Sequence, residues 1–162
     1  MIFSQTKTNE IVAELDAQRF VIDMAKLAQN EHVKDPSAYP NLFGKMVICG
    51  DDYARSKTSP TPKSVDSVFV CTNENGKSPK MFFVEFKINQ EKIDSPLASD
   101  LLGKEKSSRE LFNCGLSHDS FVVLNDNAKY EQNKNKLSKL LQPNPFLKKI
   151  SVVNMVDVHN FF

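Results

Sequence analysis

Two acidic residues and a lysine stand in a part of the chain that is otherwise built from apolar, strand-forming residues. Asp66 lies at the start of one such segment, and Glu85 and Lys87 lie two positions apart in the next. Two carboxylates that converge at the ends of strands form a hard-oxygen site suited to Mg²⁺. A neighbouring ammonium can orient an attacking water or offset negative charge that develops on a phosphate. These residue types suit metal-assisted hydrolysis of a phosphate ester.

The elements that would position these residues are the two strands of a β-hairpin. Residues 62–71 and 80–88 are rich in β-branched and aromatic side chains, and the polar stretch between them contains an Asn-Gly pair and a proline. Because side chains alternate between the faces of a strand, Glu85 and Lys87 share one face of the second strand. The hairpin could therefore bring the Asp66 carboxylate near Glu85. The same face also holds Met81 and Phe83, and the opposite face holds Phe82, Val84, Phe86 and Ile88.

Charged side chains inside an apolar strand need either a solvated face or a partner. A buried carboxylate or ammonium costs several kcal/mol unless it is paired or coordinates a metal. Glu85 and Lys87 therefore either form an ordinary ion pair on a solvated sheet face, worth about 0–1 kcal/mol, or are kept for chemistry. Both alternatives stay open on these residues, and Asp66 is the reason to weigh the second.

Pro62, Asp66 and Glu85-Phe86-Lys87 resemble the PD-(D/E)xK pattern of the restriction-endonuclease-like nucleases. The Asp begins one strand and Glu-x-Lys lies in the next, although Pro62 stands four residues before Asp66 rather than beside it. The resemblance implies that Asp66 and Glu85 hold Mg²⁺ and that Lys87 assists the attacking water. It implies hydrolysis of phosphodiester bonds in DNA as the reaction.

The resemblance also implies an acidic residue from an N-terminal helix. Glu14 is our candidate for this further metal ligand, because it lies one turn from Ile11 and close to Leu15, near the buried edge of the expected helix. A solvated helix charge is the alternative explanation for Glu14.

A local excess of positive charge supplies candidates for contact with a phosphate backbone. Residues 127–149 contain six lysines against one glutamate, an imbalance that favours binding to a polyanion. A solvated basic helix is the alternative for this segment, and a solvated connection is the alternative for the loop before Asp66. The candidate DNA-binding residues from the two regions are Lys63, Lys134, Lys136 and Lys139.

The order of expected elements predicts an α/β fold in which helices flank a central mixed β-sheet. This order is compatible with the restriction-endonuclease-like core that the resemblance implies. Besides the hairpin, the expected elements are a helix over 8–30, a strand over 45–49, a helix starting at Ser107, a strand over 121–124, a helix over 127–141 and a strand over 150–158.

Composition sets broad limits on the class of protein. The 162 residues carry a net charge of +1 and are 40% hydrophobic, which fits a single domain, 1–162, with a substantial core. This charge gives no general case for nucleic-acid binding, and the three distant cysteines match no zinc-site spacing. We find no signal-peptide pattern and no apolar run near the roughly 20 residues of a membrane span. The sequence therefore predicts a cytoplasmic protein with no membrane partner.

A second function from another class remains open. The chain could be a non-catalytic binding module, such as an immunity, inhibitor or assembly partner, that uses a sheet face or an edge strand. An apolar last strand and an exposed aromatic C-terminus, Phe161-Phe162, would suit a protein partner or a homodimer.

Overall fold

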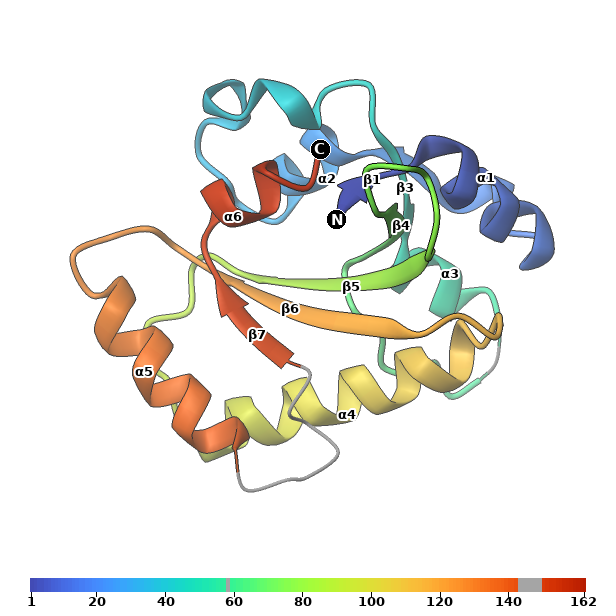
Figure 1. Ribbon diagram of the computed structural model, residues 1–162. Coiled ribbons are helices and arrows are strands. Elements are labelled where there is room, and N and C mark those ends of the chain that lie inside the picture. Colours follow the sequence, from blue (N-terminus) through green and yellow to red (C-terminus); the bar gives the residue numbers. More distant parts are fainter. Residues whose placement is uncertain (58, 143–149) are drawn as a thin grey trace.

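The computed structural model describes residues 1–57, 59–142 and 150–162 and has an α/β architecture (Figure 1). Its described strands form one seven-stranded sheet in the order β2-β3-β4-β5-β6-β7, with β1 paired to β4. The strands are β1 (Ile2–Phe3), β2 (Val21–Asp23), β3 (Met46–Cys49), β4 (Ser67–Thr72), β5 (Lys80–Lys87), β6 (His118–Leu124) and β7 (Ile150–Val153). The helices are α1 (Gln5–Glu14), α2 (Met24–Asn30), α3 (Gly50–Arg55), α4 (Ser95–Leu111), α5 (Tyr130–Leu141) and α6 (Met155–His159). The predicted class, a central mixed sheet with flanking helices, is confirmed.

Strand direction changes at β5. Each neighbouring pair from β2 to β5 is antiparallel, whereas β5, β6 and β7 run parallel. Parallel neighbours need a crossover connection, and α4 supplies it between β5 and β6. As a result α4 packs back along the sheet beside β5 (Figure 1).

Helices cover both faces of the sheet, which explains why its central strands are apolar on both sides. One face packs on α2 and α6 and includes the buried side chains of Phe82, Val84, Phe86 and Ile88. The other face packs on α1, α3, α4 and α5 and includes Met81 and Phe83. The predicted alternation along β5 is confirmed, and Glu85 and Lys87 belong to the face beneath α4.

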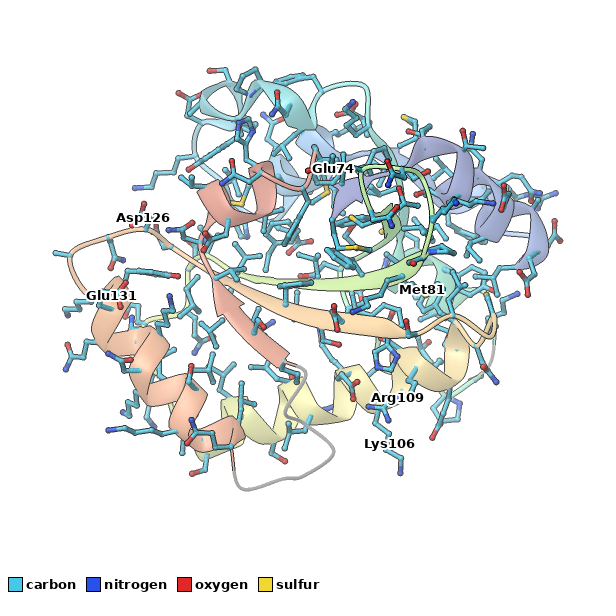
Figure 2. All side chains as sticks on the ribbon, in the orientation of Figure 1. Glu74, Met81, Lys106, Arg109, Asp126 and Glu131 are labelled. Atoms are coloured by element: carbon cyan, nitrogen blue, oxygen red, sulfur yellow. The ribbon has the colours of Figure 1, made fainter. Side chains whose placement is uncertain are left out.

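The helix α4 begins earlier than the sequence predicts. Asp94 caps it by accepting a hydrogen bond from the Leu97 N–H at 3.1 Å, and a proline stands in its first turn, so the predicted start at Ser107 is wrong. Its buried side is unusual because it includes Glu105 and Ser108 among apolar residues. Its outer side carries Lys106, which projects away from the sheet (Figure 2).

The single helix predicted over residues 8–30 is wrong as well. The segment forms α1, the short strand β2 and then α2. Asp16, just past α1, has a left-handed φ of 53°, which ends a helix. Asp23 starts the next helix because its carboxylate accepts hydrogen bonds from the N–H groups of Ala25 and Lys26. Two aspartates therefore divide a run whose apolar spacing suggested one helix.

The strand predicted over 150–158 is too long. It ends at Val153, because Asn154 and Asp157 form a reciprocal capping box that opens α6. The helix predicted over 127–141 is α5, which starts at Tyr130 and ends at Leu141 as predicted. Pro143 and Pro145, which follow it, lie outside the described residues.

The aromatic C-terminus is packed inward, so its predicted exposure is wrong. The Phe162 ring lies 4.8 Å from the Phe3 ring and 4.9 Å from the Phe69 ring, measured between centroids. Phe161 lies 4.9 Å from Phe82 in an edge-on contact. These rings are half-buried and pack against the core, so most of their contact area is already used within the chain. Within the described ranges, no helix is both long and apolar enough to cross a membrane.

Gly50 fixes the approach of α3 to the segment before β4. A Cβ atom on Gly50 would lie 2.0 Å from the Val65 carbonyl oxygen.

We expect Gly50→Ala to lower the free energy of unfolding by about 1–3 kcal/mol, as overpacking does. Urea denaturation measures this change. Gly103→Ala is the matched control, because its Cβ would meet only the Lys63 Cδ at 3.8 Å and should add about 0.5–1 kcal/mol in a helix. Equal effects of the two variants would contradict the tight approach.

Candidate functional site

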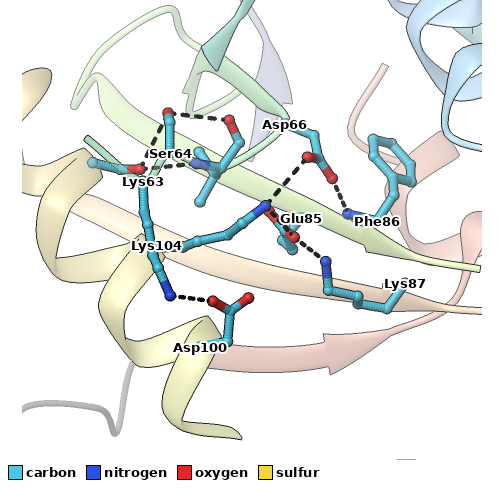
Figure 3. A network of polar contacts seen from close by, with 10 residues as sticks. Lys63, Ser64, Asp66, Glu85, Phe86, Lys87, Asp100 and Lys104 are labelled. Carbon is cyan, nitrogen blue, oxygen red and sulfur yellow. Dashed lines mark hydrogen bonds and ion pairs between the residues drawn. The ribbon is translucent and has the colours of Figure 1, made fainter. Parts of the chain in front are cut away.

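Asp66 and Glu85 lie side by side because of the register of the hairpin. Ser67 pairs with Val84 across β4 and β5, so the residue before Ser67 comes level with the residue after Val84. Both acids are buried, with Asp66 4% and Glu85 2% exposed. The sequence-predicted pair therefore does meet, under α4 rather than on a solvated sheet face (Figure 3).

Two lysines converge on this acidic pair. Lys87, the predicted partner, donates a hydrogen bond to Glu85 Oε1. Lys104 of α4 donates to the same oxygen at 2.7 Å, and its Nζ lies 3.7 Å from Asp66 Oδ1 (Figure 3). We name Asp66, Glu85, Lys87 and Lys104 the acid-lysine cluster. The sequence did not predict that Lys104 lies at the acidic pair.

Backbone groups hold Asp66 in place. The Phe86 N–H donates to Asp66 Oδ2 at 2.6 Å, which leaves Oδ1 facing Lys104. The Gly50 N–H donates to the Asp66 carbonyl oxygen at 3.0 Å. The carboxyl group is therefore oriented by the backbone of β5, and the Asp66 backbone is held by the start of α3.

A serine contact joins α4 to the same segment. The Val65 N–H donates to Ser108 Oγ at 3.0 Å, and both residues are buried. Ser108 lies one turn beyond Lys104 on α4. The contact therefore fixes the helix that carries Lys104 against the residue that precedes Asp66.

Burial and charge shift the proton equilibria of the cluster. Burial, and then the charge of Glu85, raise the pKa of Asp66 to about 8, against the opposing effects of Lys104 and the Phe86 N–H. Burial alone would lower the pKa of Lys104, but the charges of Glu85 and Asp66 raise it to about 12. Near neutral pH the cluster thus holds a proton on Asp66 and positive charge on Lys104.

Two further acids act on the cluster from the N-terminal part of the chain. Burial, and then the charges of Glu85 and Asp51, raise the pKa of Glu31. Glu31 follows the last residue of α2, and Asp51 lies in the first turn of α3. The charge of Glu31 therefore acts on Asp66, and the charge of Asp51 acts on Lys104.

Glu14, the predicted further ligand, lies elsewhere. It is exposed at the end of α1, and the described contacts do not join it to Asp66 or Glu85. Its charge acts instead on Cys114, whose thiol pKa is raised to about 11 by burial first and by Glu14 second. Glu14 lies away from the acidic pair because α1 ends at this residue, whereas the predicted helix continued to residue 30.

The predicted DNA-contacting lysines fall in two places. Lys63 lies close to the cluster and pairs with Asp100 of α4 at 2.5 Å (Figure 3). Lys134, Lys136 and Lys139 lie on α5, which packs against β6, β7 and α4 rather than on the β4–β5 hairpin. Lys134 stands over the Tyr130 ring at 5.4 Å, and the other two are exposed.

A second polar cluster lies further along α4. The buried carboxylate of Glu105 accepts a hydrogen bond from Arg109 at 2.6 Å and lies 3.0 Å from His118 Nε2. The His118 ring also stacks on Phe83, with centroids 5.1 Å apart. These contacts satisfy Glu105 and make the cluster a tie between α4 and β6.

The donor chemistry of the acidic pair fits a hard divalent cation. Glu85 Oε2 is buried and has no hydrogen-bond partner among the residues that the structure describes, whereas Oε1 has two. In the described ranges no three His, Cys, Asp or Glu side chains converge as a ready-made metal cage. Mg²⁺ commonly uses only one or two carboxylates and completes its shell with water and phosphate oxygens. Asp66 and Glu85 are the residues that would hold it.

Comparison with known proteins adds no relative: no protein-family profile, curated protein or solved structure matches this chain.

The Asp66 proton predicts how stability depends on pH. Because the folded pKa of about 8 lies above the ordinary value of 3.8, the folded state binds one proton more than the unfolded state between these limits. The free energy of unfolding should therefore fall as pH rises through this window, with a slope from this group of at most about 1.4 kcal/mol per pH unit. Asp66→Asn removes the contribution.

Urea denaturation at several pH values between 5 and 8, with EDTA present, tests this effect. The stability of wild type relative to Asp66→Asn should decrease as pH rises, and a constant difference would contradict a raised pKa. Asp119→Asn is the control, because Asp119 forms a half-exposed ion pair with Lys80.

Proposed function

We propose that this protein is a metal-dependent nuclease of the PD-(D/E)xK type, which hydrolyses phosphodiester bonds in DNA. The observation that carries the proposal is the buried Asp66–Glu85 pair with Lys87 beside it and one Glu85 oxygen without a partner in the described chain. A plain ion pair on a solvated face, the alternative explanation for Glu85 and Lys87, does not account for acids that are 96–98% removed from solvent.

The sheet topology supports the same proposal. The antiparallel strands β3, β4 and β5, joined through α4 to the parallel strand β6, are compatible with a restriction-endonuclease-like core. Fold alone does not set function, so the weight of the proposal rests on the residues of the site.

In the proposed mechanism Asp66 and Glu85 would hold Mg²⁺. When bound, Mg²⁺ would supply positive charge near a phosphate oxygen and make a nearby water more acidic. As the water oxygen bonds to phosphorus, the bond from phosphorus to one sugar oxygen would break; the water would give up a proton to solvent, and the leaving sugar oxygen would take one up.

Lys87 has the position to act on the reacting groups. Its ammonium sits at Glu85, yet its side chain is 20% exposed, compared with 3% for the Glu85 side chain. It therefore reaches from the buried pair toward the side from which a phosphate would approach. There it would orient the water and offset charge on the phosphate.

Glu31 takes the role that the sequence reasoning gave to Glu14. It comes from the end of an N-terminal helix, α2, and its charge acts on Asp66. We place it as an acid that would contact metal-bound water, and Lys63 as a contact to the DNA backbone next to the site.

Metal binding tests the two proposed ligands. Asp66→Asn and Glu85→Gln should each weaken Mg²⁺ or Mn²⁺ binding by at least about tenfold in calorimetry, because one of two charged oxygen ligands is lost. Cleavage of plasmid DNA by the same samples should be lost too. Asp119→Asn should change neither result. Unchanged metal binding in both ligand variants would overturn the metal site and with it the proposed function.

Lys87→Met separates catalysis from metal binding. Since Lys87 acts on the water and the phosphate, we expect cleavage to fall by about 10²-fold or more while Mg²⁺ still binds. Gel-based cleavage rates and calorimetry on one sample measure both quantities. A Lys87→Met protein that cleaves DNA at the wild-type rate would remove Lys87 from the mechanism.

The second candidate, a binding module without catalysis, keeps one supporting feature and loses another. Among the described strands β7 lies at an edge of the sheet and could pair with a partner strand. The aromatic C-terminus, however, is occupied by packing against Phe3, Phe69 and Phe82. The nuclease proposal therefore has the stronger support.

A further inference from the structure

Lys104 occupies the position between the two proposed metal ligands. Its Nζ lies 2.7 Å from Glu85 Oε1 and 3.7 Å from Asp66 Oδ1 (Figure 3). A cation that binds both carboxylates needs oxygen contacts of about 2.0–2.1 Å for Mg²⁺. Such an ion and the Lys104 ammonium cannot both sit between these carboxylates.

Further acids stand near this position. The charge of Asp51 acts on Lys104, and the charge of Glu31 acts on Asp66. A divalent cation that replaces Lys104 would therefore meet acids beyond Glu85, and it would displace the Asp66 proton together with the ammonium. Lys87 and Lys104 both bond to Glu85 Oε1, while Oε2 has no partner in the described part of the chain. Lys104 thus duplicates a contact that Lys87 already makes.

The surroundings of Lys104 offer it another place. Asp100 lies one turn earlier on α4, and its pKa is lowered by the Lys63 hydrogen bond and also by the charge of Lys104. Lys104 and Asp100 are four residues apart on α4, a spacing that places their side chains on the same face of the helix. A lysine stem has four flexible carbons, so a short swing moves the ammonium without moving the helix.

From these contacts we infer that Lys104 is a built-in competitor for the metal: it fills the carboxylate pair in the metal-free protein, and a divalent cation displaces it toward the phosphate of the substrate. This inference rests on the proposed function and adds a specificity-determining residue to it. The displaced ammonium then neutralises phosphate charge together with Lys87. Because the metal must displace Lys104, the affinity for the metal is lower than the acids alone would give. The displaced Lys104 is then a second cation, beside Lys87, at the phosphate.

The test is the metal affinity of Lys104→Met, measured by Mg²⁺ and Mn²⁺ calorimetry on the whole chain without DNA. We expect Kd to fall at least about tenfold relative to wild type, because the competing charge is gone. Cleavage of DNA at saturating metal should fall by about tenfold or more, because the phosphate loses one cation. Tighter metal binding with slower cleavage is a combination that loss of structure does not produce.

Lys106→Met is the matched control, because Lys106 is exposed on the outer side of the same helix and should leave both quantities unchanged (Figure 2). Lys104→Gln is a second variant, which keeps a hydrogen-bond donor at the acids and should bind metal with an affinity between wild type and Lys104→Met. Urea denaturation in EDTA confirms that each variant is folded.

The outcomes separate this inference from the proposed function. Binding to Lys104→Met that is no tighter than to wild type, while wild type does bind metal, overturns the competitor role and leaves the nuclease proposal standing. Binding to neither protein overturns both. Binding to Lys104→Met but not detectably to wild type supports both.

Discussion

The burial of two neighbouring carboxyl groups, those of Asp66 and Glu85, is the constraint on which the arrangement of the site depends. Asp66 and Glu85 are nearly removed from water, and each faces the charge of the other. The Phe86 N–H and the ammonium groups of Lys87 and Lys104 offset this cost. Buried ion clusters are weak evidence for stability, because apolar residues of similar volume often serve as well or better. This supports our proposal that the cluster, set into an apolar strand face, is kept for chemistry.

The frame around the acids is built from residues far apart in the chain. Hairpin register sets the Asp66 backbone level with Glu85, and the Gly50 N–H and the Ser108 hydroxyl hold the segment before β4 from two other elements. None of these supports comes from a long loop. Asp66 itself precedes β4, so these contacts fix the segment that carries it against α3 and α4. A site held in this way keeps its geometry better than one on an unsupported loop, as the proposed metal site would need.

Local patterns in the sequence were enough to predict the hairpin, but they did not predict the contacts between distant elements. Alternation along residues 80–88 puts the Glu85 side chain on the other sheet face from Phe82 and Phe86. Pairing of the two hairpin strands brings Asp66 next to Glu85. Lys104 offers only a weaker signal, since it flanks the buried stripe of a helix whose start depends on Asp94. Glu31 and the three-residue strand β2 lie where apolar periodicity suggested one continuous helix. The segment is divided by Asp16, which has a left-handed backbone, and by Asp23, which caps α2. Apolar periodicity does not detect either feature.

The two lysines of the cluster differ in how firmly their backbones and side chains are held. We base their proposed roles on this difference. Lys87 lies on β5, where its backbone pairs with Leu124 of β6, and its ammonium bonds to Glu85 two residues earlier on the same strand. Lys104 comes from the helix that covers the sheet, and Asp100, one turn earlier on α4, is a second acid on which its charge acts. A fixed cation suits orientation of a reacting water, whereas a cation with two alternative partners suits exchange with a metal ion. In the proposed mechanism the two lysines that bond to Glu85 Oε1 would therefore have different functions.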